Sequence, residues 1–375
     1  MQVYILKESN SDSRVAASPD TVKKMKDWGL NVVIQDNAGL KSNFSNEEYI
    51  KSGAIISNEI TDISKSDLIL KINKPSDDEI ALMNEGSVLI ASLDPYNNSD
   101  TLNKLKDKGV TSFAMELMPR ITRAQSMDIL SSQSNLAGYK AVIDATYLFN
   151  KAMPMMMTAA GTISPSKVFV VGVGVAGLQA IATAKRLGAK VEAFDTRPVV
   201  EEQVKSLGAR FVKIDIGETE ETAQGYAKEL SAEQINLQRA GMKKVCSSSD
   251  VIITTAQVFG RKAPVIITSD MIEDMQPGSV IVDMAVGTGG NVEGSIPDEN
   301  LELNGITIVG NTNLPGEVAI HASQVYSANI FNLIDEFWDQ KNSILEITTS
   351  DEILSGCLVT HKGEFVNSMV KERYS

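Results

Sequence analysis

The chain has little cysteine, little histidine and a deficit of positive charge. Only two of its 375 residues are cysteines and two are histidines, which excludes a disulfide scaffold and multi-cysteine or histidine-rich metal sites. Its 35 Lys and Arg against 48 Asp and Glu give a net charge of −13. No nucleic-acid partner is therefore expected, because a phosphate backbone needs a clustered basic surface. No apolar run reaches the ~18 residues of a membrane helix, and residues 1–10 lack a signal-peptide layout, so we expect a soluble, cytoplasmic protein without a metal site.

Short apolar runs alternate with helical patterns twice along the chain. The first alternation covers roughly the first third, and the second begins at Val168. Such alternation predicts parallel sheets with helices on both faces, here two Rossmann-like, doubly wound α/β domains with a cleft between them. A helix from Ser134 to about Met153 should lead out of the first domain, and the tail from Ile344 to Val366 should return to it. The expected domains are 1–133 with 315–375, and 134–314.

An amphipathic helix and a methionine-rich loop are expected between the two alternations. The apolar stripe of the helix expected from Ser134 includes Tyr139 and Tyr147. The methionines 155–157 follow in a loop. We expect them to act as adaptable packing rather than to hold a cofactor.

The strongest local signal is a glycine-rich turn between an apolar strand and an apolar helix. Gly172 permits the tight turn, Gly174 lets the backbone approach a pyrophosphate, and Gly177 lets the helix pack close to the strand. Asp195 ends the next strand, where an acid accepts hydrogen bonds from the adenosine ribose and repels a 2′-phosphate. The motif predicts NAD(H) over NADP(H), although Arg197 is a residue type that accommodates that phosphate. The alternative is a glycine-rich turn without a ligand.

A polar segment, Met115–Ser134, follows a predicted strand of the first domain. It combines two arginines, two acids, two amides and several hydroxyl groups beyond the carboxyl end of that strand, where open α/β sheets bind ligands. Gln125 has the paired donor and acceptor that a carboxamide requires, and an Arg–Asp pair would fix the shape of the loop. The alternative is a polar connection with helix-capping serines.

A third polar stretch, Glu218–Gly241, is long for one connection within an α/β domain. Gly225 and Tyr226 suit a flap that closes over a ligand, and the alternative is a solvated helix over 227–239. No nucleophile elbow, phosphate P-loop or metal-ligand spacing is present in the sequence. The remaining candidates, His321 and Cys246, indicate packing rather than catalysis.

These motifs resemble one known family. The segments Arg120–Ser134, Met155–Thr162 and Gly172–Gly188 are similar to the NAD(H)-binding first component of proton-translocating nicotinamide nucleotide transhydrogenase, and the resemblance covers essentially the whole chain. It implies a subunit that presents NADH for direct hydride transfer to NADP⁺ on a separate partner component. A membrane component would couple the transfer to proton translocation, so this chain would be peripheral to the inner membrane. Relatives work as a homodimer.

The resemblance also implies roles for individual residues. Arg120, Gln125, Asp128 and Ser131 match the loop that orients the nicotinamide, and Tyr226 matches the mobile loop. These five are the expected catalytic residues. The expected cofactor-binding residues are Arg120, Ile121, Thr122, Arg123, Gln125, Ser126, Met127, Asp128, Gly172, Gly174, Val175, Ala176, Gly177, Asp195, Thr196, Arg197, Gly225, Gln238 and Gln257.

Two features separate the chain from its neighbours in sequence. Gly287 stands where relatives of this family have a polar side chain. Alanine dehydrogenase, the nearest rival, needs a lysine and a histidine beside its substrate carbonyl, whereas the matching positions here are Asn73 and Ser92. Lys71 and Lys74 lie close by, so a shifted alignment would restore the lysine but not the histidine. We therefore expect a transhydrogenase component; the alternatives are an alanine dehydrogenase-like oxidoreductase and a non-catalytic NAD-binding module.

Overall fold

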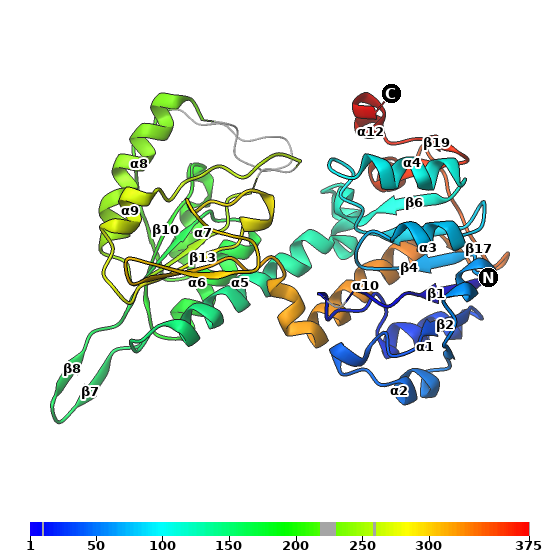
Figure 1. Cartoon of the computed structure of the whole chain (residues 1–375), viewed down its shortest axis with the longest axis horizontal. Coiled ribbons are helices and arrows are strands. Elements are labelled where there is room, and N and C mark those ends of the chain that lie inside the picture. The colour runs from blue at the N-terminus through cyan, green and yellow to red at the C-terminus, as the bar shows by residue number, and fades with distance from the viewer. Residues whose placement is uncertain (10, 218–229, 258–259, 375) are drawn as a thin grey trace. The chain divides into compact units, whose positions relative to one another are not determined.

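The computed structural model describes residues 1–9, 11–217, 230–257 and 260–374 (Figure 1). The chain forms two compact units. Unit 1 consists of Met1–Gln133 and Gly316–Ser375, and unit 2 of Ser134–Pro315. The chain passes from unit 1 to unit 2 within helix α5 (Ile129–Leu148) and returns just before helix α10 (Ala319–Glu336). Each unit contains its own mainly parallel sheet, so the predicted Rossmann-like, doubly wound fold class is confirmed.

The sheet of unit 1 has eight strands in the order β19-β18-β6-β5-β4-β1-β2-β3. Strands β1 to β6 are parallel, with the winding 3-2-1-4-5-6 of a doubly wound fold. The C-terminal strand β18 pairs antiparallel with β6, so the end of the chain completes the first sheet. The strands are β1 (Gln2–Ile5), β2 (Asn31–Gln35), β3 (Ile55–Ser57), β4 (Leu68–Leu70), β5 (Val88–Ala91), β6 (Thr111–Ala114), β18 (Leu358–His361) and β19 (Glu364–Phe365).

Serine capping boxes start three helices of unit 1. Ser18, Ser45 and Ser76 each accept a hydrogen bond from the backbone of the third helical residue, whose side chain bonds back to the cap. In α1 a proline follows the Ser18 cap, at a position where its missing N–H costs nothing. The helices of unit 1 are α1 (Pro19–Asp27), α2 (Asn46–Lys51), α3 (Asp77–Leu82), α4 (Ser99–Asp107), α10, α11 (Glu352–Cys357) and α12 (Ser368–Tyr374).

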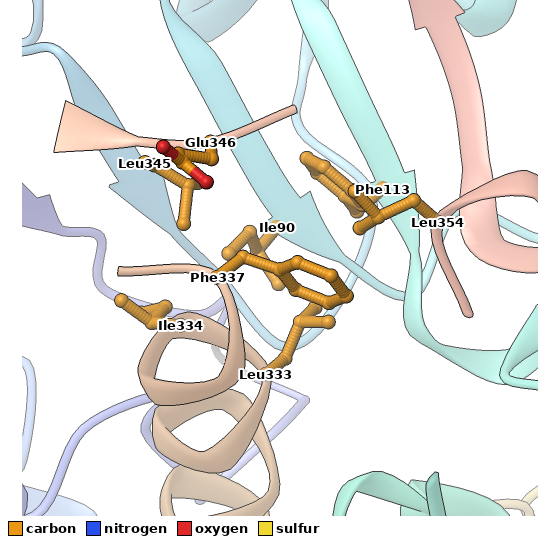
Figure 2. A pocket seen from close by; sticks show the side chains of 8 residues that line it. All are labelled: Ile90, Phe113, Leu333, Ile334, Phe337, Leu345, Glu346 and Leu354. Atoms are coloured by element: carbon orange, nitrogen blue, oxygen red, sulfur yellow. The ribbon is translucent and has the colours of Figure 1, made fainter. Parts of the chain in front are cut away.

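Helix α10 packs its apolar side on the sheet of unit 1. Figure 2 shows Leu333 of this helix, and Phe337 directly after its end, facing Ile90 of β5 and Phe113 of β6. The gap that these side chains and their neighbours leave has a volume of about 10 Å³, near the lower limit for one water molecule. This gap is core packing and cannot hold a nucleotide.

The sheet of unit 2 repeats the same winding. Its order is β11-β10-β9-β12-β13-β15-β14, and only β14 is antiparallel. Its strands are β9 (Lys167–Val171), β10 (Lys190–Phe194), β11 (Arg210–Phe211), β12 (Val251–Thr254), β13 (Val280–Asp283), β14 (Asn300–Leu303) and β15 (Ile306–Val309). Its helices are α6 (Val175–Arg186), α7 (Glu201–Ser206), α8 (Ala232–Ser247), α9 (Ser269–Glu273) and the larger part of α5.

Alternate residues of the unit 2 strands enter two separate cores. Val168 and Val170 of β9 lie in the core that contains α5 and α6 residues. Phe169 and Val171 lie in the core on the other face, together with Met242 of α8. The period of two explains why strands buried on both faces read as continuous apolar runs.

The connection after α5 differs from its prediction. Helix α5 ends at Leu148, and residues predicted as a loop form the antiparallel hairpin β7 (Met156–Thr158) and β8 (Gly161–Ile163). This hairpin projects from the body of unit 2 (Figure 1), and Met157 is 80% exposed. The adaptable packing expected of Met155, Met156 and Met157 is therefore not made against the described residues of this chain. Tyr147 is likewise 87% exposed, because the buried side of α5 is formed by alanines and Val142 instead.

Candidate functional site

The turn after β9 brings strand and helix into backbone contact. Gly172 has φ +93°, a conformation that favours glycine. A Cβ at Gly177 would lie 1.9 Å from the carbonyl oxygen of Gly172, so only glycine allows α6 to pack this close. The Thr255 hydroxyl, after β12, donates to the same carbonyl oxygen at 3.0 Å. The turn thus lies between β9 and β12, where the strand order reverses and open α/β sheets bind ligands.

Helix α6 begins at this turn without a capping side chain. Its N-cap is Gly174, and no side chain of the described residues caps it. A Cβ at Gly174 would meet no atom of the described residues within 4 Å, so these residues leave the space beside the turn open. The first-turn N–H groups, including those of Val175 and Ala176, and the positive end of the helix dipole suit a diphosphate. The residues present therefore fit the diphosphate of a dinucleotide.

Asp195 and Arg197 form one buried ion pair beside the turn. The Asp195 carboxylate accepts from Arg197 Nε at 2.9 Å, Arg197 Nη2 at 2.8 Å and the Arg197 backbone N–H at 2.9 Å. It also accepts from the Val173 N–H at 2.7 Å. The two side chains are 6% and 16% exposed. In the sequence, Asp195 indicates a ribose without a 2′-phosphate, and Arg197 indicates a ribose that carries one. In the structure the two side chains form an ion pair. Asp195 therefore neutralises the charge of Arg197 and fixes the turn.

A second buried carboxylate orders the loops after β12 and β13. Asp283 accepts hydrogen bonds from the backbone N–H groups of Ala285, Asn291 and Val292. The Asn291 side chain in turn donates to the Ala256 carbonyl and accepts from the Ala256 N–H. Sequence reasoning missed both residues. The signal for Asp283 is an acid at the carboxyl end of a buried strand, whereas Asn291, in the loop that follows, has no local signal.

The other residues predicted for unit 2 differ in their accessibility. Gln257 is exposed, and its amide donates to the Met284 carbonyl at 3.1 Å. Gln238 is buried within α8, with its amide 3.6 Å from the Met242 sulfur. Thr196 lies half-buried between the paired Asp195 and Arg197. Gly225 and Tyr226 lie outside the described residues.

The loop predicted to orient a nicotinamide lies in unit 1. Residues Thr122–Met127 form a 3₁₀ helix, in which the side chains of Gln125 and Ser126 are exposed between the buried Ala124 and Met127. Asp128 then accepts from the Ser131 N–H at 3.0 Å and from the Ser131 hydroxyl, at the start of α5. The polar side chains of the loop therefore point outward while its apolar residues hold it to unit 1.

The arginines of this loop are exposed. Arg123 binds Asp351 of the C-terminal segment through two bonds of 2.7 and 2.6 Å, so the expected Arg–Asp pair has its acid outside the loop. Arg120 is exposed, and Ile121 is half-buried beside it. The predicted site residues thus form two groups, one in each unit.

Comparison with known proteins identifies the family. The model of the alanine dehydrogenase/PNT N-terminal domain matches residues 4–137, and that of the C-terminal domain matches residues 141–368. The chain belongs to the alanine dehydrogenase/PNT family. It is 45% identical, over 98% of both chains, to the first part of NAD(P) transhydrogenase subunit alpha of Rhodospirillum rubrum. The crystal structure of transhydrogenase from Sinorhizobium meliloti matches with a TM-score of 0.89 and 45% identity, covering 98% of this chain and all of that one. Alanine dehydrogenase 1 of Staphylococcus aureus is a more distant relative, 26% identical over 98% of this chain and 95% of that protein.

In this member of the alanine dehydrogenase/PNT family, side chains of unit 1 occupy the point between β1 and β4 where the order of its strands reverses. Glu8, after β1, accepts from the Ile72 N–H at 2.7 Å and from the Asn73 amide at 2.9 Å, after β4. The Asn73 amide also donates to Asp12 at 2.9 Å. Burial raises the pKa of Glu8, although the Lys71 charge and these hydrogen bonds oppose it. The position equivalent to the glycine turn of unit 2 is thus closed by side chains of the chain itself.

Arg14 is held within the same polar cluster. Two of its nitrogens bind Asp12, and Nη1 donates to Gln133 of α5 at 2.8 Å. Burial alone would raise the pKa of Asp12, but the hydrogen bonds and charge of Arg14 outweigh it and lower the pKa to about 2. The hydroxyl of Ser92, which stands at the position matched to the histidine of alanine dehydrogenase, lies 3.1 Å from the Tyr326 hydroxyl. Neither Asn73 nor Ser92 can exchange a proton with a substrate near neutral pH.

Neither the backbone conformation nor the space at Gly287 requires glycine. A Cβ at this position would lie 3.5 Å from the Thr312 methyl, which is ordinary contact, and its φ is not positive. A side chain would fit at this position, so the backbone of this loop does not require glycine here.

Neither a metal centre nor a membrane span is present in the part of the chain that the structure describes. No cluster of three or more His, Cys, Asp and Glu side chains there could hold a metal ion. No helix in the same residues is long and apolar enough to span a membrane.

Glu116 lies at the carboxyl end of β6 and closes the next loop. Its Oε1 accepts from the backbone N–H groups of Leu93 and Asp94 at 2.8 and 2.5 Å. Its Oε2 is buried without a hydrogen-bond partner among the described residues. Burial raises the pKa of Glu116 to about 7, against the opposing effect of the backbone hydrogen bonds. Sequence reasoning recorded this acid only as part of a polar segment.

The raised pKa of Glu116 predicts how stability depends on pH. The folded chain holds a proton on this group that the unfolded chain has lost above its ordinary pKa of 4.5, so this stability is present below that value. It should be lost as the pH rises to about 7, a change of about 3 kcal/mol in the free energy of unfolding. Urea unfolding of wild type and Glu116→Gln between pH 4.5 and 8 measures it. A pH-independent difference between the two proteins would contradict the assignment.

Proposed function

We propose that this chain is the NAD(H)-binding subunit of an NAD(P)⁺ transhydrogenase, which presents NADH for direct hydride transfer to NADP⁺ on a separate component. One observation carries the proposal: unit 2 has an open dinucleotide turn, whereas the equivalent position of unit 1 is closed by Glu8 and Asn73 and offers no acid–base pair. A reaction between two nicotinamide rings needs no such pair. Similarity to transhydrogenase alpha subunits over nearly the whole chain supports the same conclusion.

The turn of unit 2 is the proposed seat for the adenosine end of the cofactor. The backbone N–H groups of Val175, Ala176 and Gly177 would bind the diphosphate at the start of α6. Asp195, Thr196 and Arg197 border the proposed ribose position. Because Asp195 already neutralises Arg197, a 2′-phosphate would bring unpaired negative charge to this edge. We expect NADH to bind more tightly than NADPH for this reason.

The loop of unit 1 is the proposed seat for the nicotinamide end. The Gln125 side chain is exposed and makes no hydrogen bond with the described residues, so its amide is available to pair with a carboxamide. Arg120, Asp128 and Ser131 would shape the loop, and Asp128 already holds Ser131. Bound NADH supplies the hydride. The protein contributes orientation and the exclusion of water, which can account for most of the rate of a transfer between aligned reactants.

The proposal includes further components. The similar Rhodospirillum rubrum protein is named as only the first part of a subunit alpha, which is consistent with partner chains that bind NADP(H) and conduct protons. We propose that this chain works on a membrane surface through those partners. An alanine dehydrogenase-like activity is less consistent with the sequence, because Asn73 and Ser92 stand at the positions matched to the lysine and histidine of that enzyme.

We also propose that the chain forms a homodimer through the β7–β8 hairpin. Every residue of the two strands is exposed, and Met155, Met156 and Met157 are 59%, 46% and 80% exposed. Tyr147 on the neighbouring α5 is 87% exposed. A projecting two-stranded hairpin is marginally stable by itself in water, so a second copy that covers these side chains would stabilise it.

The dimer proposal predicts a mass of twice 40.5 kDa for the isolated chain. Met157→Lys places a charge in the proposed contact and should shift the mass toward that of one chain, as measured by light scattering. Ile50→Lys, at an apolar residue of unit 1 that is 56% exposed, is the matched control and should remain dimeric. If Met157→Lys has the same mass as wild type, the hairpin is not the contact.

The proposed diphosphate seat predicts opposite results for two neighbouring glycines. Gly174→Ala adds a methyl group to open space, so the chain should keep its melting temperature but bind NADH about 10- to 100-fold more weakly. Gly177→Ala forces a methyl group against the Gly172 carbonyl and should lower both stability and affinity. Calorimetric titration with NADH measures the affinity of each variant. A parallel titration with NADPH measures the expected preference for NADH. Unchanged NADH affinity in Gly174→Ala would place the diphosphate elsewhere.

The transfer reaction is tested by mixing the chain with an NADP(H)-binding component. Wild type should then transfer hydride from NADH to NADP⁺, and Gln125→Asn should slow the transfer by about 10- to 100-fold because the shortened side chain misplaces the ring. The affinity for NADH should change little, and Gln203→Asn on α7, which is exposed, should behave as wild type. A silent mixture, together with oxidation of NADH by pyruvate and ammonia, would favour the dehydrogenase alternative.

A further inference from the structure

Two asparagines of helix α10 hold the backbone of the loop that contains Gln125. The Asn329 amide donates to the carbonyl oxygen of Ser126 at 2.7 Å, and the Asn332 amide donates to the same oxygen at 3.0 Å. Asn332 is half-buried, whereas Asn329 is only 7% exposed. Hydrogen bonds at buried positions are the more costly to lose, because the abandoned groups have no water to replace their partner. Asn329 is therefore the principal tether.

The second half of the Asn329 amide is also occupied. Its oxygen accepts from the Ser132 hydroxyl at 2.7 Å, within the first turn of α5. One side chain thus connects the 3₁₀ helix Thr122–Met127, the start of α5 and the middle of α10. Because both sides of the amide are used, its orientation is fixed, and a rotation that moved the Ser126 carbonyl would break two bonds.

The hydrogen bond from Asn329 to Ser126 lies directly beside Gln125, the exposed residue proposed to orient the nicotinamide. The buried Ala124 and Met127 anchor the 3₁₀ helix on either side of Gln125 and Ser126. Between these anchors, Asn329 and Asn332 both donate to a single backbone carbonyl, that of Ser126. The direction of the Gln125 side chain depends on this short segment of backbone, which carries no internal side-chain cap.

We propose that Asn329 is a positioning residue for hydride transfer, which fixes the Gln125 segment through the Ser126 carbonyl. The inference rests on the proposed role of Gln125 and extends it to a residue in a helix distant in the sequence. Asn329 would act through the loop and would not touch the nucleotide. Its loss should therefore reduce the turnover of bound NADH more than the affinity for NADH.

Asn329→Asp tests the proposal with an almost isosteric change. The carboxylate can still accept from Ser132 but cannot donate to the Ser126 carbonyl, and its charge repels that oxygen. The rate of hydride transfer at saturating NADH should fall by about 10- to 100-fold, whereas the dissociation constant for NADH should stay within about threefold. Ser132→Ala leaves the Asn329 donor in place but removes its support, and should produce a smaller fall in rate.

Hydrogen exchange gives a readout that does not require activity. In Asn329→Asp, backbone amides of residues 120–128 should exchange faster than in wild type. Asn103→Asp on α4 is the matched control, since an acid there keeps the oxygen that accepts from Lys106, and it should change neither exchange nor rate. If wild type transfers hydride and Asn329→Asp equals it in both rate and exchange, the inference is wrong while the proposed function stands. If wild type with its partner transfers no hydride, the proposed function is wrong, and faster exchange in Asn329→Asp would then support the tether alone.

Discussion

The close approach of α5, α6 and strand β9 is the constraint on which the nucleotide turn depends. A Cβ at Gly177 would lie 1.9 Å from the Gly172 carbonyl, and a Cβ at Gly138, in the middle of α5, would lie 2.1 Å from the Ala176 carbonyl. Glycine ordinarily weakens a helix interior by about 1 kcal/mol relative to alanine. Here that cost permits two helices to pack at backbone distance. The turn between Gly172 and Gly177 therefore has one geometry, and the N–H groups of α6 are aimed before any ligand arrives.

The two sheets share one winding but differ chemically at the point where the strand order reverses. In unit 2, glycines and an uncapped helix leave this point open. In unit 1, the Glu8 carboxylate bonds to the backbone and side chain that follow β4, and Arg14, Asp12 and Gln133 complete the cluster. A polar cluster in which each member has a partner is rigid and leaves no donor set for a substrate. The two units thus share one architecture, but among the described residues the turn is open in unit 2 and closed in unit 1.

Sequence patterns predicted most of the strands because buried parallel strands form continuous apolar runs, and the glycine turn because its residue types have steric causes. The hairpin β7–β8 was missed because its exposed methionines resemble core residues in composition. The helix stripe through Tyr147 failed because small alanines, not aromatic residues, form the packed side of α5. Contacts between distant segments, such as Asn329 with Ser126 and Arg123 with Asp351, leave no local pattern. They arise only when the C-terminal part of the chain returns to unit 1.

This return bears on the proposed hydride transfer, which requires orientation of the reactants and no proton-transfer pair. Transfer between two aligned rings is limited by geometry, so the relevant property of a site is the stiffness of its supports. Helix α10 contributes Asn329 to the Gln125 loop and Tyr326 to the cluster near Ser92, and it packs on β5 and β6 beneath (Figure 2). One helix therefore joins the sheet, the closed cluster and the exposed loop of unit 1. The backbone of the loop Thr122–Met127 is thus held by residues of the core, although the side chains of Gln125 and Ser126 remain exposed.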